Sequence, residues 1–127
     1  MGKLEADVVK QIKSRLSSGS LSGVIIWWMR LQVGSFKVDG RYIRTAKELV
    51  GTPDFIALVR NKQDNITALF IEAKSDTGCL RPEQKAFSDK YNKFKDVAVV
   101  MIRDIKELNA HLDLIEKDLV NEMRNPG

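Results

Sequence analysis

The sequence has few of the residues from which disulfides and many metal sites are built. It contains one cysteine, Cys79, and one histidine, His111, in 127 residues. A single cysteine excludes an intrachain disulfide and a cysteine-based zinc site, and a single histidine excludes a site with several histidine ligands. If the chain is an enzyme, we therefore expect it to work with carboxylates, lysine and a hard cation that prefers oxygen ligands.

Long apolar runs are also missing. The longest run, VIIWWM at residues 24–29, is too short to cross a bilayer. The first residues, MGKLEAD, lack the apolar stretch of a signal peptide, so we expect a cytosolic protein.

The composition favours a folded domain with mixed surface charge. Apolar residues make up 43% and charged residues 30%, which allows a core to form. A length of 127 residues predicts one domain that spans 1–127. The net charge of +4 permits a polyanionic partner without requiring one, because positive and negative residues are mixed along the chain.

Apolar spacing predicts an α/β fold. Residues from Leu4 to Leu16 repeat at helical spacing, and the branched and aromatic residues from Val24 to Val33 are typical of a strand. Asp39-Gly40, between two short apolar stretches, indicates a hairpin turn. The other expected elements are a helical turn at 45–50, strands at 54–59, 66–73 and 97–102, and helices that begin at Pro82 and after Asp104.

The expected order is α-β-β-β-β-α-β-α, with a mixed sheet flanked by helices. The strand–helix–strand unit between residues 66 and 102 predicts two parallel strands with a right-handed crossover. Phe87, Tyr91 and Phe94 are expected on the buried face of the helix that begins at Pro82. The last helix is expected to bury a stripe made of Leu108, Leu112, Ile115, Leu119 and Met123.

Polar residues interrupt two of the expected strands. Glu72 and Lys74 share one face at the end of an otherwise apolar strand, and Asp54 follows Pro53 at the start of the preceding strand. A short antiparallel connection would bring Asp54 and Glu72 together, where two carboxylates repel each other unless a cation lies between them. Mg²⁺ commonly uses one or two protein carboxylates together with water and phosphate. A plain Glu72–Lys74 salt bridge and a turn role for Asp54 stay open.

Two further polar residues fall on apolar helix faces. Glu5 lies near the middle of the face of the first helix, where a buried carboxylate needs a partner or a cation, although first-turn residues often escape burial. Gln84 shares the inward face of Phe87 and Tyr91. A buried amide there needs hydrogen-bond partners, so Gln84 either caps a backbone group or orders a site.

Taken in chain order, these residues resemble the virus-type replication-repair nuclease (VRR-NUC) domain of the PD-(D/E)XK nuclease superfamily. The residues that carry the resemblance are Glu5, Gly51-Thr52-Pro53-Asp54, Glu72-Ala73-Lys74, Gly78 and Glu83-Gln84-Lys85. The resemblance covers nearly the whole chain and implies a restriction-endonuclease-like core. One departure is Arg81-Pro82, where a small polar helix cap would be more typical.

The resemblance implies a role for each site residue. Asp54 and Glu72 would be metal ligands together with the backbone carbonyl of Ala73, and Glu5 would complete the cluster, directly or through water. Lys74 would orient or activate the attacking water, or stabilise charge on the phosphate. Gln84 would be a supporting residue, and the cofactor would be Mg²⁺, with Mn²⁺ able to substitute.

The function implied is a metal-dependent DNA endonuclease, in particular a homodimeric resolvase of four-way (Holliday) junctions in a phage or bacterial replication-repair setting. The alternatives are a flap- or nick-specific nuclease, a non-catalytic DNA-binding domain of the same fold, and a protein-interaction domain. Candidate dimer contacts are the residues from Ile25 to Trp28, with the alternative that a helix covers each face of this strand. The hairpin near Asp39-Gly40 is a candidate for contacting a partner or DNA. Unranked candidates for phosphate contacts are Lys10, Lys13, Arg15, Arg30, Lys37, Arg41, Arg44, Lys47, Arg81 and Lys85.

Overall fold

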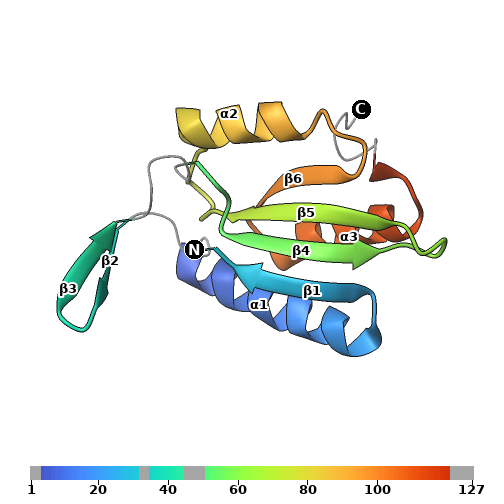
Figure 1. Cartoon of the computed structure of the whole chain (residues 1–127), viewed down its shortest axis with the longest axis horizontal. Helices are drawn as coiled ribbons and strands as arrows, with labels where there is room; N and C mark the ends of the chain where they lie inside the picture. The colour runs from blue at the N-terminus through green and yellow to red at the C-terminus, as the bar shows by residue number, and fades with distance from the viewer. Residues whose placement is uncertain (1–3, 32–34, 45–50, 121–127) are drawn as a thin grey trace.

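A computed structural model of the chain describes residues 4–31, 35–44 and 51–120, and these form an α/β fold with a four-stranded mixed sheet and three helices (Figure 1). The elements are α1 (Glu5–Ser22), β1 (Ile25–Arg30), β2 (Ser35–Val38), β3 (Arg41–Arg44), β4 (Phe55–Arg60), β5 (Ile66–Ala73), α2 (Pro82–Tyr91), β6 (Val97–Ile102) and α3 (Ile105–Glu116). The predicted order of helices and strands is confirmed. The predicted hairpin consists of two short strands, β2 and β3.

The main sheet has the strand order β1-β4-β5-β6. β4 pairs antiparallel with both β1 and β5, whereas β5 and β6 are parallel, as predicted for the strand–helix–strand unit. β2 and β3 form a separate two-stranded sheet, and their turn residues Asp39 and Gly40 have φ values of 50° and 79°. Two consecutive positive φ values are what a tight turn matched to the twist of a hairpin requires.

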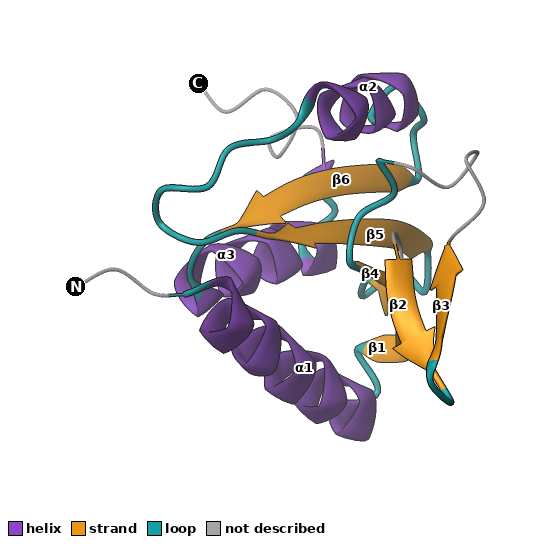
Figure 2. Cartoon of the chain, turned by 90° about the vertical axis from the view of Figure 1, so that its left-hand side faces the viewer, coloured by secondary structure: helices purple, strands orange, loops and turns teal. Residues whose placement is uncertain are grey.

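Helices cover both faces of the sheet. α1 and α3 pack on one face and α2 packs on the other, against β6 (Figure 2). The core between α1, α3 and the sheet is one cluster of buried apolar side chains, which includes Ile12, Phe55, Leu69, Ile102 and Leu112. None of the described helices combines the length and the apolar character needed to span a membrane.

Two predicted helix faces are longer than the helices themselves. α3 ends at Glu116, and the positive φ of Asp118 (60°) turns the chain away, so Leu119 lies beyond the helix with 39% of its surface exposed. The prediction that Leu119 extends the buried stripe is therefore wrong, and Met123 falls outside the described residues. The predicted helical turn at 45–50 also falls outside them.

α2 ends at Tyr91 because the next residue bonds to the sheet. The side-chain amide of Asn92 accepts a hydrogen bond from Val99 N at 2.8 Å and donates one to Val99 O at 3.2 Å. Phe94 therefore lies past the helix and is 55% exposed, so its predicted place on the buried face is wrong. Phe87 and Tyr91 are half-buried and in ring contact with each other, with centroids 4.5 Å apart.

Candidate active site

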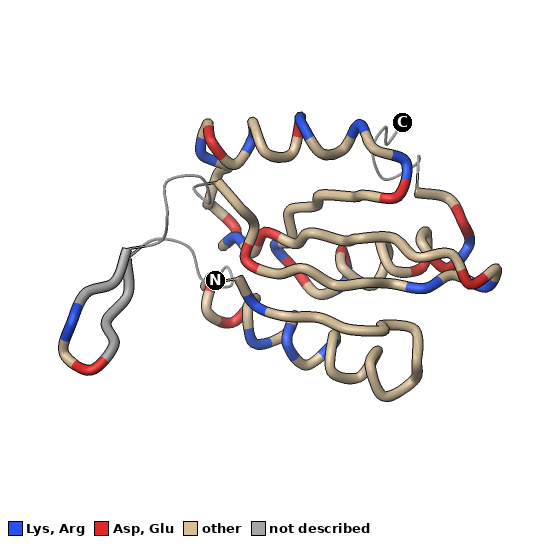
Figure 3. Tube along the Cα trace, in the orientation of Figure 1, with Lys and Arg blue, Asp and Glu red and all other residues tan. Residues whose placement is uncertain are grey.

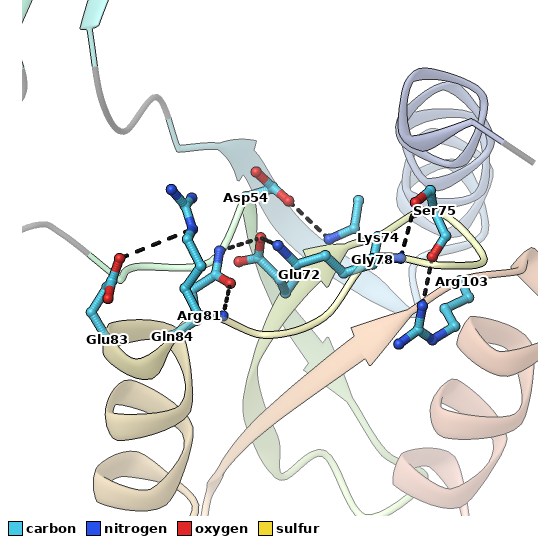
Figure 4. Close-up of polar contacts among 10 residues, drawn as sticks. Asp54, Glu72, Lys74, Ser75, Gly78, Arg81, Glu83, Gln84 and Arg103 are labelled. Carbon is cyan, nitrogen blue, oxygen red and sulfur yellow. Dashed lines mark hydrogen bonds and ion pairs between the residues drawn. The ribbon is translucent and has the colours of Figure 1, made fainter.

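The two expected carboxylates meet at one end of the sheet, where β4 begins and β5 ends. Phe55 pairs with Ile71, and continuing this antiparallel register places Asp54 opposite Glu72. Asp54 Oδ2 accepts a hydrogen bond from the backbone N–H of Ala73 at 2.8 Å, which fixes the carboxylate against β5 (Figure 4). The structure thus brings Asp54 and Glu72 together, as the short antiparallel connection predicts.

The loop before Asp54 is positioned by direct contact with the first turn of α2. Gly51 has a φ of 91°, a backbone conformation that residues with a side chain rarely adopt. A Cβ atom at Gly51 would lie 2.8 Å from the carbonyl carbon of Glu83, so only glycine allows this approach. Buried Pro53 then restricts the chain immediately before Asp54.

Lys74 follows β5 and is enclosed by its own loop. Its backbone N–H donates to Ile102 O at 3.0 Å, and its side chain is only 10% exposed. A Cβ atom at Gly78 would lie 3.4 Å from Lys74 Cδ, so the chain passes close over the lysine stem. Lys74 Nζ lies 3.9 Å from Glu72 Oε1, at the long end of an ion pair.

Gln84 joins α2 to the carboxylate pair. Its Oε1 accepts from the backbone N–H of Arg81 at 2.8 Å, and its Nε2 donates to Glu72 Oε1 at 3.0 Å. Gln84 is buried, as its position on the inward helix face predicts. The residue therefore does both things that the sequence left open, because it caps the helix backbone and it orients Glu72.

One residue of this region, Arg103, was not expected from the sequence. Its Nη1 donates to Ser75 O at 2.6 Å and to Asp76 O at 3.1 Å, which holds the loop that follows Lys74 (Figure 4). The Ser75 hydroxyl oxygen closes the same loop by accepting from Gly78 N at 3.1 Å. The parallel pairing of Ala73 with Ile102 puts Arg103 beside Lys74, so the residue after the second parallel strand was the available signal.

Burial and charge make Glu72 an unusual carboxyl group. The pKa of Glu72 is raised to about 8, first by burial and then by the charge of Asp54. Lys74 lowers this pKa, whereas a hydrogen bond with Asp54 and the charge of Glu5 raise it further. The nearby lysine therefore does not compensate for placing Glu72 in a buried position beside a second carboxylate.

Glu5 lies at the first residue of α1 and is exposed. The buried face of α1 begins one turn later and consists of Val8, Ile12, Leu16 and Gly19. Of the two interpretations left open for Glu5, escape from burial at the first turn is the one found. Its charge nevertheless acts on the pKa of Glu72, which places Glu5 within electrostatic range of the site.

The donor atoms at this end of the sheet suit a hard cation with open coordination positions. In the described part of the chain, no three His, Cys, Asp or Glu side chains form a metal-binding group by themselves. Asp54 and Glu72 supply two carboxylates, the number that Mg²⁺ commonly takes from a protein while water and phosphate oxygens complete its shell. A cation between them would also offset the repulsion that raises the pKa of Glu72.

In β1, the strand proposed for dimer contacts, some side chains lie in the core and others are exposed. Ile25 is buried and Trp28 packs on Phe55, with ring centroids 6.2 Å apart. A register shift between Ile25 and Trp27 leaves Ile26 and Trp27 exposed, at 45% and 46% of their surface. β1 is an edge strand of the sheet, so this exposed apolar surface is accessible from the side.

Comparison with protein-family models, curated proteins and solved structures finds no match to this chain. Membership of the VRR-NUC family therefore stays a prediction.

Proposed function

We propose that this chain is a metal-dependent nuclease that hydrolyses phosphodiester bonds in DNA, with a PD-(D/E)XK core of the VRR-NUC kind. The observation that carries the proposal is the placement of half-buried Asp54 against buried Glu72 and Lys74, in which the pKa of Glu72 is about 8. A salt bridge that served stability alone would be poorly built in this way, because Lys74 Nζ is 3.9 Å away and a second carboxylate opposes it. A divalent cation makes the same arrangement favourable.

Each residue then has a role in phosphodiester hydrolysis. Asp54, Glu72 and the backbone carbonyl of Ala73 would hold Mg²⁺ or Mn²⁺, with Glu5 acting directly or through water. When bound, such an ion lowers the pKa of a coordinated water and neutralises charge on the phosphate. Lys74 supplies a fixed positive charge for the phosphate oxygens or orients the attacking water, and Gln84 keeps Glu72 in place through its 3.0 Å hydrogen bond.

The proposed substrate is branched DNA, above all the four-way junction, cut by a homodimer. A small core with one site gains selectivity for a symmetric substrate most directly when two copies present two sites. The exposed apolar residues Ile26, Trp27 and Met29 of β1 offer a surface for a second copy. The β2–β3 hairpin extends from the end of the sheet at which the site lies (Figure 1), where it is available to a partner or to DNA.

A cleavage assay tests the proposal. Labelled four-way junction, 5′ flap, nicked duplex and linear duplex are incubated at low salt with Mg²⁺, Mn²⁺ or EDTA. The variants are Lys74→Ala and, as a matched loss of one positive charge, Lys62→Ala in the exposed turn at the far end of the sheet. We expect paired cuts in the junction that require the metal, disappear in Lys74→Ala and persist in Lys62→Ala.

The other outcomes distinguish the alternatives. Cleavage of flaps or nicked DNA without cleavage of junctions would favour the flap- or nick-specific nuclease. Tight binding without cleavage of any substrate would favour a DNA-binding domain of the same fold. If the protein neither binds nor cuts any of these DNA substrates, a nucleic-acid function is contradicted altogether.

A further inference from the structure

The basic residues of this chain are distributed too evenly to mark a DNA-binding surface by themselves. Lys and Arg residues occur along α1, along α2 and in the turns at the end of the sheet away from the site (Figure 3). Among those candidates for phosphate contacts whose side chains the structure describes, Arg81 differs from the others in its connection to the carboxylates. Its backbone N–H donates to Gln84, and Gln84 in turn donates to Glu72.

The backbone of Arg81 is held at a fixed place relative to Asp54 and Glu72. The chain around Gly51 packs on the carbonyl group of Glu83, so the loop that leads to Asp54 and the first turn of α2 are in direct contact. Gln84 ties the same turn to β5 through its 3.0 Å hydrogen bond to Glu72. Two independent contacts therefore hold Arg81 beside the site.

The guanidinium group of Arg81 points into solvent and makes only a long ion pair with Glu83. The side chain is 70% exposed, and its Nε lies 4.0 Å from Glu83 Oε1, whose side chain is itself 42% exposed. An exposed ion pair at this distance contributes little to stability. In Figure 4 the guanidinium extends on the same side of the site as the Asp54 carboxylate, so it is accessible to a ligand that approaches the two carboxylates.

We propose that Arg81 binds a backbone phosphate of DNA next to the phosphate that is cleaved. This inference rests on the proposed nuclease function and names a substrate-binding residue for it. The Asp54 carboxylate repels a polyanion, and buried Lys74 supplies one positive charge near it. An exposed guanidinium beside the pair offsets that repulsion and matches the geometry of a phosphate group with two parallel N–H donors.

Equilibrium binding without a divalent metal tests the proposal separately from cleavage. Fluorescence anisotropy of a labelled four-way junction is measured in EDTA, with KCl varied from about 50 to about 200 mM. For wild type, log K falls linearly with log salt, and the slope reports the number of phosphates contacted by the protein. At the lowest KCl concentration, Arg81→Ala should bind the junction about tenfold more weakly than wild type. Its slope of log K against log salt should be shallower by about 0.9 for each active site in contact with DNA.

Two further variants separate a phosphate contact from a structural role. Glu83→Gln breaks the Arg81–Glu83 pair but leaves the guanidinium in place, so it should bind DNA as tightly as wild type or more tightly. Lys62→Ala removes the same charge from the opposite end of the sheet and should leave the slope unchanged. Under Mg²⁺, Arg81→Ala should raise KM about tenfold and change kcat by less than about twofold, as expected for lost binding that is equal in the ground and transition states.

Several results would overturn the inference and leave the proposed function intact. If wild type cuts the junction and Arg81→Ala keeps the wild-type salt slope, Arg81 does not contact phosphate. If Glu83→Gln weakens binding as much as Arg81→Ala does, the ion pair is structural and the assignment is wrong. Absence of DNA binding by wild type would instead contradict the proposed function itself.

Discussion

Gln84 Nε2 donates to Glu72 Oε1 at 3.0 Å while Gln84 Oε1 accepts from the first turn of its own helix. One buried amide thus joins the start of α2 to a carboxylate at the end of β5. Replacing Gln84 with Ala should therefore reduce both helix stability and the order of the site. We expect a loss of about 1–3 kcal/mol in the free energy of unfolding, measured with urea, and a fall in cleavage rate.

Asn61→Ala is the matched control for Gln84→Ala. Asn61 is also buried, and its Oδ1 accepts from Gln63 N and Asn65 N in the turn at the opposite end of the sheet. Its removal should destabilise the fold to a similar degree and leave the rate per folded molecule unchanged. Equal losses of rate in the two variants would mean that Gln84 acts through stability alone.

The pKa of Glu72 predicts how stability depends on pH when no metal is bound. The folded-state pKa of about 8 lies above the ordinary value of 4.5, so folding takes up a proton between these values. The contribution of the protonated Glu72 side chain to the free energy of unfolding is therefore fully present below about pH 4.5 and is lost as pH rises through about 8. Glu72→Gln removes this titration, so near pH 9 in EDTA it should be more stable than wild type by on the order of 2 kcal/mol.

Urea unfolding of wild type and Glu72→Gln across the neutral range checks this sign. Wild type should lose stability relative to the variant as pH increases. A constant difference between the two proteins from acidic to alkaline pH would show that Glu72 has an ordinary pKa in the folded chain.

The contact between Gly51 and Glu83 predicts a specific sensitivity to a methyl group. Gly51→Ala combines a positive φ with a clash against backbone, so it should destabilise the chain by at least about 2 kcal/mol and displace Asp54. Gly40→Ala is the control, because Gly40 also has a positive φ but nothing lies within 4 Å of the added Cβ. Gly40→Ala should lower the free energy of unfolding by about 1 kcal/mol. The two variants are compared by thermal unfolding, and equal losses of stability would contradict the clash at Gly51.

Arg103 is predicted to act as a positioning residue for Lys74. Arg103→Lys keeps the charge but removes the planar guanidinium group whose Nη1 donates to both Ser75 O and Asp76 O. We expect kcat to fall several-fold while KM and the salt dependence of DNA binding stay close to wild type, since DNA contacts are not removed. A change confined to KM would instead indicate that Arg103 contacts the substrate.

The main outlines of fold and site follow from local sequence patterns. The two-residue period of a strand places Glu72 and Lys74 on one face, and the break at Pro53 places Asp54 at the start of the neighbouring strand. The contacts that the sequence patterns did not predict, those of Arg103, join parts of the chain that are far apart in the sequence. Arg103 reaches the loop after Lys74 because Ala73 pairs with Ile102, and the predicted parallel arrangement of the two strands did not by itself give that register.

Helix ends were the other point that periodicity did not determine. Leu119 continues the apolar spacing of α3, but the positive φ of Asp118 ends the stripe first. Phe94 continues the spacing of α2, yet the bonds from Asn92 to Val99 stop the helix at Tyr91. In both cases a single residue that bonds or turns at the helix end overrides an apolar repeat.

The most direct test of the central claim is a calorimetric titration of the protein with Mg²⁺ in two buffers of different ionisation enthalpy, near neutral pH. If Asp54 and Glu72 hold the ion, wild type should bind Mg²⁺ and release close to one proton per ion, since Glu72 is protonated before binding. Asp54→Asn and Glu72→Gln should both lose binding, and Lys62→Ala should retain it. Binding that releases no proton would contradict the raised pKa of Glu72, and binding that survives in both carboxylate variants would contradict the assignment of this pair as the metal site of a nuclease.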